Sequence, residues 1–300
     1  MSEAPLDSPL ETPPLGRRYE VGGRRLLLHR SGSGGPTVVV LPGANLVGLD
    51  YLNLHHRTAE LTTSVLYDRA GTGWSDWIEL PRTAAEVADE LRELLHVAGL
   101  PGPYLLVGHS LGGAHARRFA QRFPLEVAGL LLLDPFHEDL TTGAPQEVLD
   151  RLAELKDLEL PEATEEQVQR SREVLREHFA SWPEAVREPL IEHHLSAWRT
   201  GLLESRNLYD VVTDELRDGP ALPDVPMIVI SALGPDANQS QMWSEEVVRL
   251  TNERKQRLHA ELAASVSHGE HRVVTDAGHG WLHEERQDAV LRAIEDLLSR

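Results

Sequence analysis

The segment from Leu105 to Gly113 constrains the fold more than any other part of the chain. An apolar run over Leu105–Val107 ends in Gly108-His109-Ser110-Leu111-Gly112, and a helical pattern follows at once. Glycines on either side of a serine allow a sharp strand-to-helix turn that pushes the serine outward. The N–H groups at the start of the helix would then face the position where an oxyanion forms. The segment therefore predicts a nucleophilic Ser110 and acyl-transfer chemistry.

Composition limits the kinds of protein that the chain can form. Its 300 residues, of which 41% are hydrophobic and 26% charged, allow one large α/β domain with a sizeable insertion. Without cysteine, neither a disulfide nor a thiolate metal site can form. A formal net charge of −19 disfavours nucleic acid and anionic membrane surfaces as partners. We expect the acidic run from Glu138 to Glu166 to be a solvated face.

The first residues, Met1 to Leu15, are rich in proline and hold no basic residue. This composition predicts a flexible tail over residues 1–15 and does not fit a signal peptide. No apolar run in the chain approaches the roughly 18 residues of a membrane-spanning helix. The expectation is a soluble, cytoplasmic protein, and the oligomeric state is left open.

Short aliphatic runs alternate with helical patterns along most of the chain, which predicts buried parallel strands in a doubly wound sheet. Two runs that flank Gly22-Gly23 predict an antiparallel hairpin at the start. The expected strands are Arg17–Val21, Arg24–Arg30, Thr37–Leu41, Val65–Asp68, Tyr104–Val107, Leu130–Asp134, Met227–Ser231 and His271–Thr275. The expected helices are Leu49–Leu61, Thr83–Ala98, Gly113–Arg122, Glu245–Ala264 and Asp288–Leu298.

One long interval breaks this alternation. Between Phe136 and Leu222 the pattern contains no convincing strand, only helical stretches at Pro145–Leu155, Thr164–Phe179, Pro183–Arg199 and near Asp210. We therefore expect a helical cap over residues 136–222, inserted into a core formed by residues 16–135 and 223–300.

Four motifs occur in an order that resembles the α/β-hydrolase superfamily. They are the elbow Gly108–Gly112, the turn Leu41-Pro42-Gly43-Ala44, the loop Asp68–Ser75 and Gly278-His279-Gly280. The resemblance covers the chain from about Arg17 onward, and Leu133–Asp139 makes it similar to capped bacterial serine hydrolases. It implies a mostly parallel eight-stranded sheet, a cap over the active site and a Ser-His-acid triad.

The resemblance assigns the catalytic base to His279. For the acid, two carboxylates compete. Most of the superfamily would use the position of Asp236, which here lies in an out-of-step Gly234-Pro235-Asp236 turn. Asp134 directly follows a predicted strand, which would hold the carboxylate rigidly, so we prefer Asp134 and keep Asp236 as the alternative.

The oxyanion hole is expected to use two backbone N–H groups, those of Leu111 and Ala44. Pro42 replaces the histidine that is usual at this turn, but a backbone donor survives that change. Asn45, Phe136 and Trp198 are the candidate residues of the substrate pocket, because the cap would cover the strand ends where ligands bind. The histidine pairs 55–56 and 193–194 lack a completing carboxylate, so we expect no metal and no cofactor.

A serine at the elbow disfavours dehalogenase and epoxide-hydrolase chemistry, which use an aspartate there. The leading hypothesis is a serine hydrolase that cleaves a small or medium apolar carboxylic ester or lactone through an acyl-enzyme. The alternatives are carbon–carbon bond hydrolysis or perhydrolysis on the same triad, and a ligand receptor with negligible turnover.

Overall fold

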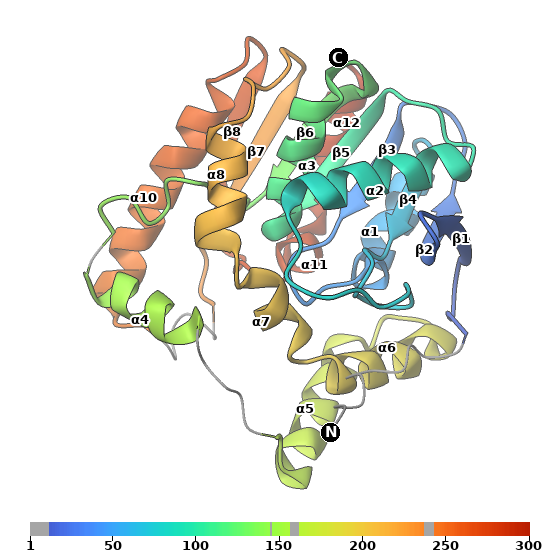
Figure 1. Cartoon of the computed structure of the whole chain (residues 1–300), viewed down its shortest axis with the longest axis horizontal. Helices are drawn as coiled ribbons and strands as arrows, with labels where there is room; N and C mark the ends of the chain where they lie inside the picture. The colour runs from blue at the N-terminus through green and yellow to red at the C-terminus, as the bar shows by residue number, and fades with distance from the viewer. Residues whose placement is uncertain (1–11, 145, 157–161, 237–242) are drawn as a thin grey trace.

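The computed structural model describes residues 12–144, 146–156, 162–236 and 243–300 (Figure 1). At its centre lies an eight-stranded sheet in the order β1-β2-β4-β3-β5-β6-β7-β8. Strand β2 runs antiparallel to β1 and β4, and all other neighbours pair in parallel. The predicted mostly parallel, doubly wound sheet is confirmed. The strands are β1 (Arg17–Val21), β2 (Arg24–Ser31), β3 (Thr37–Leu41), β4 (Ser64–Tyr67), β5 (Tyr104–His109), β6 (Val127–Leu133), β7 (Met227–Ala232) and β8 (Gly269–Val274).

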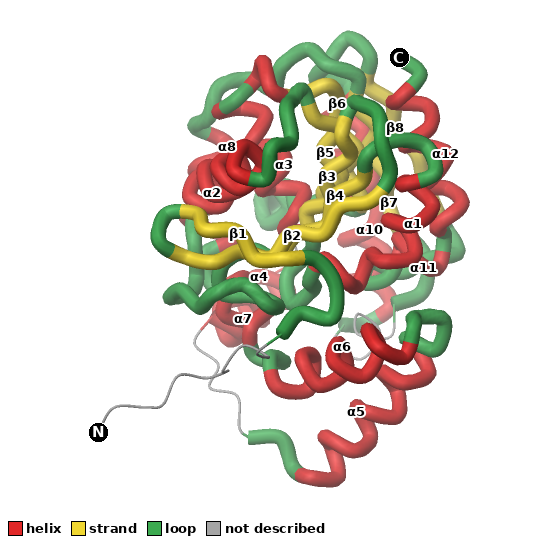
Figure 2. Tube along the Cα trace, turned by 90° about the vertical axis from the view of Figure 1, so that its right-hand side faces the viewer, coloured by secondary structure: helices red, strands yellow, loops and turns green. Residues whose placement is uncertain are grey.

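Helices cover both faces of the sheet (Figure 2). Helices α2 (Ala84–Val97), α3 (Leu111–Arg122) and α10 (Glu245–Ala263) pack on one face, while α1 (Leu52–Ala59) and α12 (Gln287–Leu298) pack on the other. Successive residues of a strand point to opposite faces, so each central strand contributes to both apolar layers. In β5, Leu106 joins the layer beneath α2 and α3, and Val107 joins the layer beneath α1 and α12.

Some boundaries differ from the sequence-based expectation. The helix expected at Leu49–Leu61 is a 3-10 turn, η1 (Gly48–Tyr51), followed by α1, because Asp50 accepts a hydrogen bond from the Val47 N–H and fixes a tight turn. A second 3-10 turn, η2 (Pro124–Glu126), precedes β6, and a short helix, α11 (Leu282–Glu285), follows His279. Residues 1–11 of the expected tail and Pro145 lie outside the described residues.

The described residues between β6 and β7 form helices. These are α4 (Gln146–Lys156), α5 (Glu165–His178), α6 (Glu184–Ser196), α7 (Thr200–Ser205), the π-helix η3 (Leu208–Val212) and α8 (Thr213–Arg217). The single helix expected at Pro183–Arg199 ends earlier, because the chain turns at Ala197 and Thr200 donates to the Ala197 carbonyl. Figure 1 places α5 and α6 beyond one end of the sheet. We propose that residues 136–222 act as a cap on a core of residues 16–135 and 223–300.

The helical segment between β6 and β7 packs against η1. The indole N–H of Trp182 donates to the carbonyl of Leu49 at 2.9 Å. Trp182 is buried, together with Leu190 and Ile191 of α6, in the same apolar cluster as Leu49. This packing anchors α6 against η1.

Gly112 allows helix α3 to approach strand β3. A Cβ atom at this position would lie 2.0 Å from the Leu41 carbonyl oxygen and 2.6 Å from that of Pro42. Only a glycine fits here, because both obstructing atoms belong to the backbone. The close approach brings the start of α3 beside the Pro42–Asn45 turn.

We predict that Gly112→Ala destabilises the protein by about 1–3 kcal/mol, since α3 and β3 must separate to admit the methyl group. Urea denaturation followed by circular dichroism measures the change. Gly280→Ala is the matched control, because a Cβ there meets no atom within 4 Å, and its effect should stay within about 0.5 kcal/mol. Equal stability of the two variants would contradict this explanation.

Candidate active site

Three segments bring Ser110, His279 and Asp134 together at the carboxyl ends of the strands. Ser110 follows β5, Asp134 follows β6, and His279 lies in the loop after β8. The His279 Nδ1–H donates to Asp134 Oδ2 at 2.6 Å, because a carboxylate can only accept. His279 Nε2 then accepts from the Ser110 hydroxyl at 2.9 Å. The three side chains form one hydrogen-bonded chain that can carry a proton away from Ser110.

The backbone is strained where this site is built. Among the described non-glycine residues, three have a positive φ: Asn45 at 63°, Ser110 at 53° and Asp134 at 41°. Side chains rarely adopt this conformation, and such positions cluster at functional sites. Two of the three belong to the hydrogen-bonded chain, and the third lies in the turn after β3.

Asp134 is almost fully enclosed, with 1% of its surface exposed. Its Oδ1 accepts from the Ala232 N–H at 3.0 Å, and its Oδ2 accepts from the Lys255 ammonium at 2.9 Å as well as from His279. Burial alone would raise the pKa of this carboxyl, but Lys255 and the His279 hydrogen bond together hold the pKa well below its usual range. Asp134 is therefore ionised at neutral pH.

The alternative acid, Asp236, lies beside the same loop. A Cβ atom added to Gly278 would come within 3.3 Å of Asp236 Oδ2, so this carboxylate lies against the residue that precedes His279. The Nδ1 proton of His279 is nevertheless directed to Asp134. The geometry thus favours Asp134 as the partner of the imidazole.

The expected oxyanion donors lie on adjoining backbone segments. Leu111 is the first residue of α3, so its N–H has no acceptor inside the helix. Ala44 lies in the turn that Leu46 closes by donating to the Gly43 carbonyl at 3.3 Å. A Cβ at Gly43 would be 3.4 Å from the Ser110 Cβ, so this turn lies directly against the elbow. Leu111 and Ala44 therefore belong to backbone segments that adjoin Ser110.

A buried ion pair holds the turn after β3. Arg69 donates to the Pro42 carbonyl at 2.7 Å and to the Gly43 carbonyl at 3.0 Å. It also pairs with Glu204 of α7 at 2.7 Å, and Glu204 in turn accepts from the Asn45 N–H at 3.0 Å. Both partners are enclosed, with side-chain exposures of 2% and 5%. Through this pair a helix between β6 and β7 fixes the backbone of the candidate oxyanion turn.

His109 connects the same turn to His279. The Tyr51 hydroxyl accepts from the Gly43 N–H at 3.2 Å and donates to His109 Nδ1 at 2.7 Å. The His109 Nε2–H then donates to the His279 carbonyl at 2.8 Å, because a carbonyl can only accept. Burial lowers the pKa of His109 to about 4, so this ring is neutral at physiological pH. The neutral ring positions the His279 loop by a hydrogen bond.

The candidate pocket residues occupy different places. The Phe136 N–H donates to the Ser110 carbonyl at 3.0 Å, so Phe136 borders the elbow. Asn45 lies against Gly201 of α7, where an added Cβ would come 2.4 Å from the Asn45 Cβ. Trp198 is partly buried between α6 and α7, with the Arg199 guanidinium over its ring. Phe136 and Asn45 thus flank the Ser110 region, and the role of Trp198 stays a prediction.

A cavity of about 510 Å³ has Tyr209, a neighbour of Phe136, in its wall. Helices α4 and α10 contribute most of its lining, including Val148, Leu152 and Leu250. Tyr209 belongs to the same lining and contacts Phe136 edge to face, with 5.6 Å between ring centroids. The Phe136–Tyr209 pair therefore joins the cavity wall to the residue beside Ser110.

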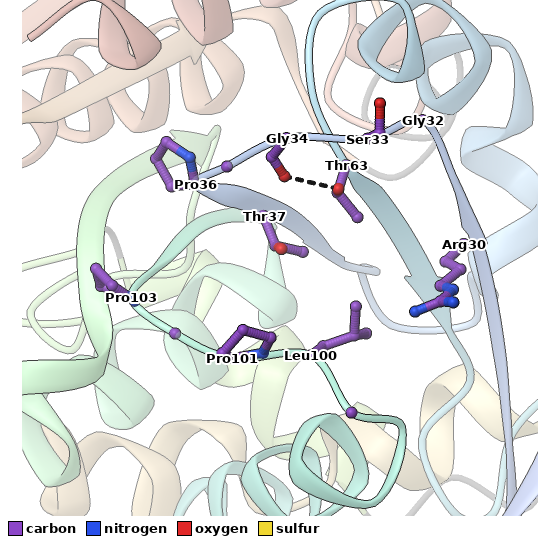
Figure 3. A pocket seen from close by; sticks show the side chains of 13 residues that line it. Arg30, Gly32, Ser33, Gly34, Pro36, Thr37, Thr63, Leu100, Pro101 and Pro103 are labelled. Atoms are coloured by element: carbon purple, nitrogen blue, oxygen red, sulfur yellow. Dashed lines mark hydrogen bonds between the residues drawn. The ribbon is translucent and has the colours of Figure 1, made fainter.

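A second pocket, of about 700 Å³, lies at the opposite end of the sheet (Figure 3). Its lining comes from the turns that precede β3 and β5, and it includes Thr63, whose hydroxyl donates to the Gly34 carbonyl at 2.7 Å. Ser110 lies at the other end of β5, so this pocket does not reach the triad.

In the described residues, no group of three or more His, Cys, Asp or Glu side chains has the arrangement of a metal site. No helix in the same residues is long and apolar enough to cross a membrane.

Sequence reasoning missed three groups that the structure brings to this site: Lys255, Glu204 and Tyr51. Lys255 had a local signal, since it precedes Leu258 by three residues and Leu262 by seven, and so interrupts the apolar stripe of α10. Glu204 had none, because its partner lies 135 residues away in the sequence. Tyr51 resembled an ordinary apolar residue of a helix.

We predict that Glu204→Ala lowers the free energy of unfolding by about 3–5 kcal/mol, because it leaves Arg69 buried without its carboxylate. Chemical denaturation measures the loss. The matched control is Glu154→Ala, which removes the acid of the exposed Arg151–Glu154 pair and should cost at most about 1 kcal/mol. Similar losses for both variants would show that the Arg69–Glu204 pair does not hold the turn.

Comparisons with known proteins agree with this architecture. The uncharacterized protein YbdG of Bacillus subtilis is 28% identical over 121 residues, which are 40% of this chain and 37% of that protein. The matched regions span less than half the length of the curated relatives.

Two solved structures share the fold over almost the whole chain. A thermophilic esterase from Thermogutta terrifontis has a TM-score of 0.66 at 22% identity, covering 95% of this chain and 98% of its own. The enol-lactonase from Burkholderia xenovorans has a TM-score of 0.63 at 16% identity, covering 94% and 100%. At these identities the likeness concerns the fold alone. The sequence model of the Alpha/beta hydrolase family matches residues 38–293, and the chain belongs to that family.

Proposed function

We propose that the protein is a serine hydrolase that cleaves a carboxylic ester or lactone through an acyl-enzyme. The observation that carries this proposal is the hydrogen-bonded chain from Ser110 Oγ through His279 to Asp134. Such a chain, at the elbow of a strand-turn-helix, is the arrangement that activates a serine for acyl transfer.

The geometry allows the following reaction. Ser110 Oγ attacks the acyl carbon while its proton passes to His279 Nε2, and Asp134 stabilises the imidazolium that forms. The N–H groups of Leu111 and Ala44 receive the oxyanion. His279 returns the proton to the leaving alcohol as the ester bond breaks, which leaves the acyl group on Ser110. Water, deprotonated by His279, then releases the acid and restores the serine.

The surroundings of Ser110 support an apolar substrate of small or medium size. Phe136 borders the elbow, and the cavity with Tyr209 in its wall combines aliphatic side chains such as Leu152 and Leu250 with the charged residues Glu253, Arg254 and Arg257. Apolar lining around a few polar groups is the usual character of a small-molecule site. The names of the two structural neighbours, an esterase and an enol-lactonase, lie within the same class of reaction.

Ser110→Ala tests the nucleophile. We expect loss of p-nitrophenyl acyl ester hydrolysis by up to about a millionfold, because a triad acts as a unit, with the thermal midpoint unchanged. A variant that kept more than a tenth of the activity would place the nucleophile elsewhere. A parent protein that releases one equivalent of p-nitrophenol and then stops would be a receptor with negligible turnover.

A comparison of Asp134→Asn with Asp236→Asn tests which carboxylate is the acid of the triad. We expect Asp134→Asn to lower kcat at least about a hundredfold, because an amide favours the wrong imidazole tautomer, while Asp236→Asn stays within a few-fold of the parent. Thermal unfolding of both variants separates this effect from the loss of a structural hydrogen bond. The opposite ranking would assign the role to Asp236.

A further inference from the structure

The chain contains two lysines, Lys156 and Lys255, beside many arginines. Lys255 lies on α10 with 8% of its surface exposed, and lysine is almost never this buried without a partner. Its ammonium donates to Asp134 Oδ2 at 2.9 Å and to the Ala232 carbonyl at 2.6 Å. The buried cation therefore binds the carboxylate that receives the His279 proton.

Lys255 and His279 share one oxygen atom. The Nζ of Lys255 and the Nδ1 of His279 both lie within 2.9 Å of Asp134 Oδ2. The negative charge of Asp134 favours a protonated imidazole, and the ammonium opposes that charge at the same atom. Lys255 thus acts on the charge balance that decides whether His279 is free to accept the Ser110 proton.

Other titratable groups face the Asp134–His279 pair from neighbouring elements. From α10, His259 Nδ1 lies 3.9 Å from Asp134 Oδ1, and burial lowers the pKa of His259 to about 4. From β5, the buried His109 bonds to the His279 carbonyl. From the loop after β7, Asp236 lies at Gly278, and from α11, Glu285 accepts a hydrogen bond from the Gly278 N–H at 2.8 Å.

We propose that Lys255 is a positioning residue of the triad, whose ammonium keeps the Asp134–His279 pair free of an added proton and so extends Ser110 reactivity to lower pH. This inference rests on the proposed serine-hydrolase function. A lysine suits the position because its compact ammonium is a point charge that reaches two oxygen atoms at once.

The experiment measures the rate at which a fluorophosphonate labels Ser110 as a function of pH, which requires no substrate turnover. In Lys255→Met and Lys255→Gln we expect the acid limb of the profile to move to higher pH by about one unit or more, because the pair then takes up a proton more readily. Lys255→Arg retains the positive charge without the compact ammonium, so its acid limb should lie between those of the parent and of the neutral variants. Arg249→Gln, which removes an exposed cation from the same helix, is the control for net charge and should leave the acid limb in place.

The outcomes separate the two proposals. A parent protein that is not labelled at any pH contradicts the proposed function itself. If the parent and both neutral variants are labelled and their pH profiles have the same acid limb, only the role of Lys255 is overturned. A lower thermal midpoint in the neutral variants would then show that Lys255 is purely structural. If Lys255→Met does not fold, Lys255→Gln, which keeps an amide donor, gives the same test.

Discussion

The hydrogen bonds to the buried carboxylate of Asp134 are the interactions on which the rest of the site depends. This carboxylate accepts hydrogen bonds from β7 through Ala232, from α10 through Lys255 and from the loop after β8 through His279. A carboxylate this enclosed would lose its charge unless several donors stabilised it. The same donors hold three separate segments at the carboxyl ends of the strands. A single ionised group therefore aligns the imidazole with the Ser110 hydroxyl.

A second buried ion pair holds the turn after β3, which carries the proposed oxyanion donor. Arg69 and Glu204 hold the turn after β3 from two sides, one from the core and one from α7. Tyr51 and His109 then connect that turn to the His279 backbone. The strained conformations of Asn45, Ser110 and Asp134 persist because this network over-determines them. These hydrogen bonds hold the backbone of the turn in one orientation, which is what the proposed stabilisation of an oxyanion requires.

The sequence predicts the fold well because its strands are buried on both faces and form continuous aliphatic runs, as in Leu130–Leu133. The elbow and the His279 loop are also readable, since each carries glycines at fixed spacing. Contacts between elements that are distant in the chain cannot be predicted from the sequence pattern. The Arg69–Glu204 and Asp134–Lys255 pairs join residues 135 and 121 positions apart, and only the folded sheet brings them together. The turn at Ala197 was not predicted, because its hydrogen bonds interrupt a sequence pattern that is otherwise helical.

Mapping the site of covalent modification tests the central claim most directly, namely that Ser110 is the activated nucleophile. The folded 300-residue chain is treated with a fluorophosphonate and digested, and tandem mass spectrometry locates the adduct. We expect one adduct per chain, on Ser110, and none on a chain denatured before treatment. An adduct on another residue, or labelling that survives denaturation, would contradict this claim.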